Sequence, residues 1–71
     1  MNARDWIDAF AARLDTAAPT TEEFATLLDL AGEAAHSSER VAAPVACWVA
    51  ASAGVEPRQA LAAAREIGED G

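Results

Sequence analysis

Residues 35–44, Ala-His-Ser-Ser-Glu-Arg-Val-Ala-Ala-Pro, separate two apolar segments of this chain that both have helical periodicity. The stretch contains the only histidine, His36, and then an acid and a base side by side at Glu39 and Arg40. It ends at Pro44, which suits the first position of a helix and disfavours helical angles in the residue before it. The stretch is therefore predicted to connect two helices, with the connection itself over residues 37–43.

Four short helices are predicted from the spacing of apolar residues and from the signals at their ends, over residues 2–16, 20–36, 44–53 and 57–67. Asn2 is a good N-cap, and Thr20 with Glu23 forms a capping box. Trp6 and Phe10 are four residues apart on one helical face and are expected to seed the core. Alanine dominates the apolar residues, so the predicted fold is all-α, a compact bundle of four short helices forming a single domain over residues 1–71.

Composition excludes several classes of function. The net charge is −7, with five arginines and no lysine, so nucleic acid and membrane are not expected as partners. Without lysine there is no Walker-type phosphate loop and no Schiff base. One cysteine and one histidine cannot form an internal disulfide or the usual zinc sets, and no cofactor is expected. The N-terminus lacks a secretory pattern, so a cytoplasmic location is expected.

The predicted helix over residues 44–53 has no polar face, because Val45, Cys47, Trp48 and Val49 cover it on every side. A helix of this kind is either central in its bundle or covered by another chain. A domain of 71 residues can hardly cover it completely. This favours a protein partner or a homodimer.

Four residues are candidates for a ligand or partner site. His36 either lies near the last carbonyls of its helix, which is the more ordinary interpretation, or forms one wall of a site. For Glu39 and Arg40, bonds to the loop backbone rank first and recognition of an anion by Arg40 ranks second. Trp48 is interpreted first as a packing anchor, although a half-exposed tryptophan also suits a protein interface.

A catalytic constellation is not visible, and the chain is not expected to be an enzyme. Cys47 lies in an uncharged segment, where burial makes a thiol inert, and a nucleophile–base pair with His36 has no third orienting group. The acids Glu22, Asp29 and Glu33 are interpreted as a solvated helix face rather than a metal site.

The motif Leu27-Leu-Asp-Leu-Ala31, followed by Ala35-His-Ser-Ser-Glu-Arg-Val-Ala-Ala-Pro44 and later by Ala53-Gly54, resembles a small bacterial helical domain of unknown function. The resemblance covers almost the whole chain. Val41 departs from the pattern, in which proline is more usual. Members of this family occur alone or appended to enzymes similar to the nucleotidyltransferase of molybdopterin-guanine dinucleotide biosynthesis. The resemblance implies an accessory role in molybdenum-cofactor metabolism and supplies no catalytic residues.

Two functions follow as hypotheses. The first is a non-enzymatic binding or accessory module that docks through the third helix and the loop before it. The alternative is binding of a small anion or cofactor phosphate by His36 and Arg40.

Overall fold

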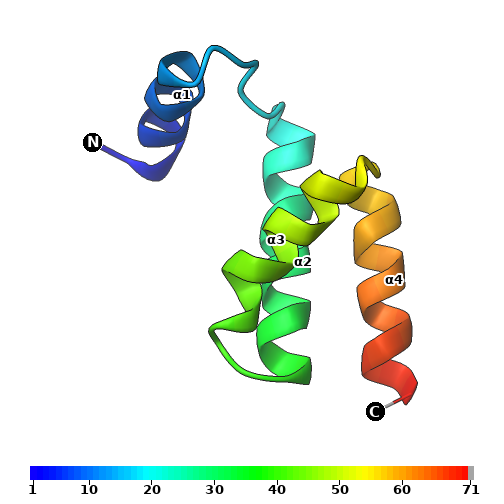
Figure 1. The fold of residues 1–71 in the computed structure, drawn as a ribbon. Helices are drawn as coiled ribbons and strands as arrows, with labels where there is room; N and C mark the ends of the chain where they lie inside the picture. Colours follow the sequence, from blue (N-terminus) through cyan, green and yellow to red (C-terminus); the bar gives the residue numbers. More distant parts are fainter. Residues whose placement is uncertain (71) are drawn as a thin grey trace.

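The computed structural model describes residues 1–70, which form four α-helices (Figure 1). α1 spans Ala3–Arg13, α2 spans Thr21–Ser37, α3 spans Ala42–Ala53 and α4 spans Pro57–Asp70. No strand occurs in this part of the chain. The predicted all-α class, a small bundle of four helices, is confirmed.

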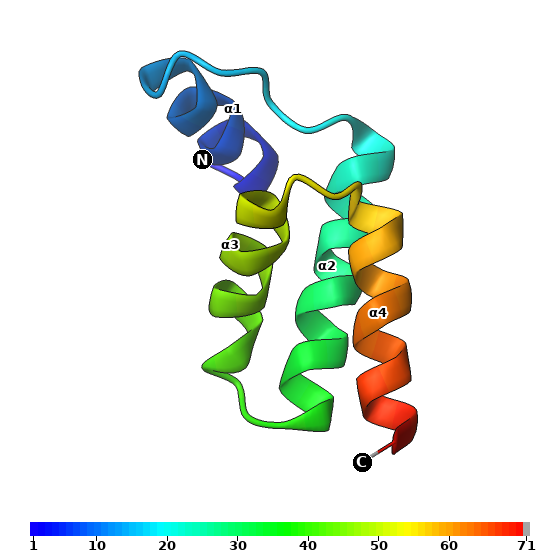
Figure 2. The ribbon, with the colours of Figure 1, turned by 45° about the vertical axis from the view of Figure 1, so that its right-hand side comes forward.

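α2 is the central helix, and it packs against both α3 and α4 (Figures 1 and 2). Leu30 of α2 and Leu61 of α4 are the buried leucines at the centre, with exposed fractions of 3% and 8%. α3 has no fully buried residue, so it is a peripheral helix covered on one side only. The sequence allowed two positions for this apolar helix, either at the centre of the bundle or against another chain. Within this chain, the structure excludes the central position.

Local hydrogen bonds begin the first two helices as predicted. The Asp5 backbone N–H donates to Asn2 Oδ1 at 2.8 Å. At the start of α2, the Glu23 N–H donates to Thr20 Oγ1 at 3.0 Å, and the Thr20 N–H donates to Glu23 Oε1 at 2.8 Å. Each bond satisfies a backbone donor that has no partner inside the helix, so these starts are fixed by nearby residues.

α1 ends at Arg13, three residues before the predicted end. Asp15 adopts a left-handed conformation with φ 57°, and its N–H donates to the Ala12 carbonyl at 3.1 Å. The Thr16 N–H donates to the Ala11 carbonyl at 3.0 Å. This pair of bonds is a Schellman motif, which ends a helix usually at glycine and here at an aspartate.

α3 begins at Ala42, two residues before the predicted start. The Ala42 N–H donates to the Glu39 carbonyl at 2.9 Å, and the Ala43 N–H donates to the Arg40 carbonyl at 3.1 Å. Pro44 is the third residue of α3, where a helix needs no N–H donor. The prediction that Pro44 starts the helix and forces Ala43 out of it is wrong for this reason, and the connection is only residues 38–41.

α4 does not stop at Gly68 but continues to Asp70. A Cβ placed on Gly68 would lie 2.7 Å from Glu33 Oε1 and 3.0 Å from Ser37 Oγ. Gly68 therefore marks a close approach of α4 to α2 rather than the end of a helix. The neighbouring Ile67 is 69% exposed.

Trp6 and Phe10 do not seed the core. Their rings stack on each other, with centroids 5.0 Å apart and an interplanar angle of 27°, yet the residues remain 53% and 48% exposed. The reason is the position of α1, which lies across one end of the bundle instead of along it (Figure 2). Of the α1 residues, only Ala11 is buried.

Candidate functional site

The outward face of α3 is an exposed apolar surface. Val41, Val45, Trp48 and Val49 lie along it, and their exposed fractions are 70%, 60%, 71% and 55%. No residue from 41 to 55 is charged. We call these four residues the α3 patch. Soluble monomers rarely expose a contiguous apolar surface of this kind without a binding role.

An apolar groove adjoins the α3 patch, because α3 and α4 diverge on either side of α2. Its volume is about 550 Å³, and every residue that lines it is apolar. Leu30 and small alanine side chains of α3 and α4 form much of the lining, together with Val45, Val49 and Ile67. These last three residues are more than half exposed. The groove and the α3 patch therefore share Val45 and Val49.

His36, Glu39 and Arg40 lie at the end of the bundle away from α1, where α2 passes into α3 (Figure 1). His36 is in the last turn of α2, and all three residues are exposed. Within residues 1–70, none of the three side chains makes a hydrogen bond or ion pair. The prediction that they clamp the loop is therefore wrong: the connection is short enough for backbone bonds to hold it.

Trp48 projects from the middle of α3 and not from the connection. Its exposure of 71% contradicts the interpretation as a packing anchor and agrees with the alternative, a tryptophan placed for an interface. The four candidate residues therefore belong to two places. His36, Glu39 and Arg40 form a polar end, and Trp48 belongs to the apolar patch.

Cys47 lies on the half-buried side of α3. Desolvation by burial raises the pKa of its thiol above the ordinary value. The thiol is accordingly neutral at pH 7, as the uncharged sequence around it predicted. No bond joins it to His36 within the described residues, so the pairing of nucleophile and base does not form.

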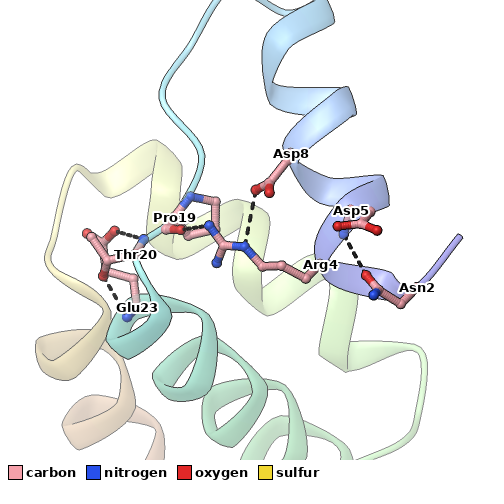
Figure 3. A network of polar contacts seen from close by, with 7 residues as sticks. All are labelled: Asn2, Arg4, Asp5, Asp8, Pro19, Thr20 and Glu23. Carbon is pink, nitrogen blue, oxygen red and sulfur yellow. Dashed lines mark hydrogen bonds and ion pairs between the residues drawn. The ribbon is translucent and has the colours of Figure 1, made fainter.

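Arg4 is a residue that the sequence interpretation missed. Its Nε lies 3.1 Å from Asp8 Oδ1, and its Nη2 donates to the Pro19 carbonyl (Figure 3). Its guanidinium also lies over the ring of Phe24. Arg4 thus links α1 to the start of α2. Only the four-residue spacing to Asp8 was visible in the sequence, and that spacing is common on exposed helices.

A polar hollow of about 320 Å³ lies between the starts of α2 and α4. Three of its four charged groups have partners: Arg58 pairs with Glu22, and Glu23 belongs to the capping box, while Glu56 adds a further acid to the lining. Glu22 thus makes an exposed ion pair instead of being only solvated as predicted. Such a pair contributes at most about 1 kcal/mol.

Two features are absent from residues 1–70. No group of three or more His, Cys, Asp or Glu side chains is arranged to hold a metal ion. None of the helices combines the length and the apolar character that crossing a bilayer requires.

The fold and surface define a small helical domain with an uncharged, exposed helix beside an apolar groove. The chain belongs to a family described as a domain of unknown function, DUF6457, whose model matches residues 1–70. No curated protein and no solved structure matches the chain. The family membership agrees with the predicted class of domain and carries no activity with it.

Proposed function

We propose that this domain is a non-enzymatic interaction module that binds a protein through the α3 patch and the connection before it. The observation that carries the proposal is the exposure of Trp48, at 71%, among three valines that are each more than half exposed. Exposed tryptophan surrounded by aliphatic side chains is typical of the centre of protein interfaces.

The electrostatics support a protein partner. The chain has a net charge of −7, yet the α3 patch and the rest of residues 41–55 contain no charged side chain. Burying this surface therefore removes no charge from water, and desolvation does not oppose docking there.

The partner proposed first is a nucleotidyltransferase of molybdopterin-guanine dinucleotide biosynthesis. This choice rests on the resemblance of the 35–44 motif to domains appended to such enzymes. An accessory domain needs no catalytic groups of its own, and the resemblance supplies none.

Calorimetric titration of the purified domain into such a nucleotidyltransferase tests the proposal. Val45→Glu and Val49→Glu should abolish binding, because each would bury an unpaired charge in the interface. Ala62→Glu is the matched control, since Ala62 is an exposed residue of α4 that does not line the groove. Binding that survives both valine substitutions would overturn docking through α3, and no binding by the wild type would remove this partner.

The second candidate function is recognition of a small anion by His36 and Arg40. Both side chains are exposed and make no bond within residues 1–70, whereas Arg4 and Arg58 are engaged. Nearby Glu39 and the net charge of −7 oppose an anion, so this function ranks second. Titration of inorganic phosphate and a nucleotide, followed by the His36 ring resonances, decides it. Unchanged resonances at millimolar ligand would exclude it.

A further inference from the structure

The total accessible surface of the chain is larger than a monomer of its mass should have. It measures 5394 Å² for a mass of 7.4 kDa. A folded monomer of this mass exposes roughly 4,200 Å². The excess of about 1,200 Å² exceeds the ~800 Å² that each partner contributes to a standard interface. The chain therefore has enough uncovered surface for a stable association.

The exposed surface has both a projecting side chain and a groove. Trp48 protrudes from α3 with 71% of its surface exposed, and the groove of about 550 Å³ between α3 and α4 lies beside it. A protrusion and a hollow on one face are what a two-fold interface requires, because each residue that one copy inserts must find its site on the other copy. The alanine lining of the groove leaves room for a large side chain.

The charge distribution limits where two copies could pair. Two copies at −7 each repel one another through most of their surfaces. The face from residue 41 to residue 55 is uncharged, so it is a surface that two copies can share without placing like charges together. A partner selected by charge would instead require complementary charges on this face, and there are none.

We propose that two copies of this chain pair through their α3 patches about a two-fold axis, with Trp48 of each copy inserted into the α3–α4 groove of the other. This inference rests on the proposed docking function of α3, and it places a second copy on that surface, where the copy competes with the nucleotidyltransferase for binding. α3 then becomes a central helix of the dimer, which is the position that its uniformly apolar sequence suits.

Sedimentation equilibrium and tryptophan fluorescence of the whole chain test the proposal. Trp6→Phe preserves the stack on Phe10 and leaves Trp48 as the only tryptophan. The expected result is a mass that rises from 7.4 kDa toward twice that value with concentration. The Trp48 emission should shift to the blue over the same range, because the ring leaves water.

Substitutions identify the surface. Val49→Glu should weaken the dimer by at least about 100-fold, because it places an unpaired charge in each half of the interface. Trp48→Ala should also give a monomer, and circular dichroism of both variants should show intact helices. Ala62→Glu adds the same charge outside the groove and should leave the dimer unchanged.

Three outcomes would overturn the pairing. A chain that remains at 7.4 kDa to millimolar concentration is not a dimer. A dimer that Val49→Glu leaves intact is formed by another surface. A dimer whose Trp48 emission does not shift lacks the proposed insertion. A monomeric chain that binds another protein, and whose binding is abolished by Val49→Glu, would reject the dimer but support docking through α3. If Val49→Glu alters neither association, both proposals fail.

Discussion

The guanidinium carbon of Arg4 in α1 lies 5.4 Å from the centroid of the Phe24 ring in α2. The same side chain donates to the Pro19 carbonyl in the connection between these helices. Since α1 buries only Ala11, this cation–π contact and hydrogen bond are the main specific attachments of α1 to the bundle. A single arginine thus supplies both the hydrogen bond and the cation–π contact that join the N-terminal helix to the start of α2.

Arg4→Ala should lower the free energy of unfolding by about 1–2 kcal/mol, through loss of a cation–π contact and a charged hydrogen bond. Amide exchange in α1 should accelerate more than exchange in α2. Arg4→Lys should lose most of the same stability, because an ammonium lacks the planar fork. Arg13→Ala is the control: Arg13 is exposed, and its loss should change stability by less than about 0.5 kcal/mol. Equal effects at both arginines would contradict the role of Arg4.

Gly32→Ala should stabilise the chain by about 0.5–1 kcal/mol in urea unfolding. Gly32 lies inside α2, and a Cβ at this position would meet nothing within 4 Å. Alanine then gains its full helix propensity without a clash. Gly68→Ala should increase stability by a smaller amount, because the Glu33 carboxylate must move away from the new methyl group. A larger gain at Gly68 than at Gly32 would show that the approach of α4 to α2 is less close than the structure has it.

Gly54→Ala should destabilise the chain by about 1 kcal/mol. Gly54 caps α3 in the left-handed region at φ 71°, where a Cβ is unfavourable even though the surrounding space is open. Thermal unfolding of this variant should be compared with that of Gly32→Ala. Neither new methyl group meets a neighbouring atom, so a difference in melting temperature reports the backbone conformation and not packing. Equal melting temperatures for the two variants would contradict the left-handed conformation of Gly54.

Asp15→Gly should be more stable than Asp15→Ala by about 1 kcal/mol. Both substitutions remove the same negative charge, so their difference reports the left-handed conformation at φ 57° alone. Chemical unfolding of the two variants measures it. If Asp15→Ala equals or exceeds Asp15→Gly, the Schellman motif at the end of α1 is not formed in solution.

Burial raises the pKa of the Cys47 thiol in the folded chain. A group of this kind holds its proton more tightly when folded, so stability is complete below the unfolded pKa and falls as pH rises toward the folded pKa. The chain has no lysine and no tyrosine, so Cys47 is the only side chain that titrates between about pH 8 and pH 10. Urea unfolding should therefore weaken over this range in the wild type and stay level in Cys47→Ala. Parallel curves would contradict the burial of the thiol.

Some ends of the helices could be predicted from nearby residues and others could not. The starts at Asn2 and Thr20 were predictable because each depends on residues three positions away. The end of α1 was not, because Asp15 adopts a conformation that glycine usually adopts. The start of α3 was misplaced because proline is tolerated throughout the first turn of a helix, and Pro44 alone does not fix which of those positions it occupies.

The candidate site was predictable only in part. The uncharged run through Trp48 indicated an interface, and the structure leaves that tryptophan exposed. The groove between α3 and α4 had no signal in the sequence, because alanine occurs on every face of these helices. The composition of residues 36–40 indicated a polar site, yet the side chains of His36, Glu39 and Arg40 make no bonds within residues 1–70. The contacts of Arg4 could not be predicted, since its partners Pro19 and Phe24 are distant in the sequence.

By itself, the sequence determined that this chain is helical, where its first two helices begin, and that one helix is apolar on all sides. These properties depend on capping, propensity and spacing, which act over a few residues. Only the tertiary structure decided which apolar side chains are buried, placing Leu30 at the centre while Leu28 is 61% exposed. In alanine-rich helices the apolar face is wide, so small differences in how helices cross choose among its residues.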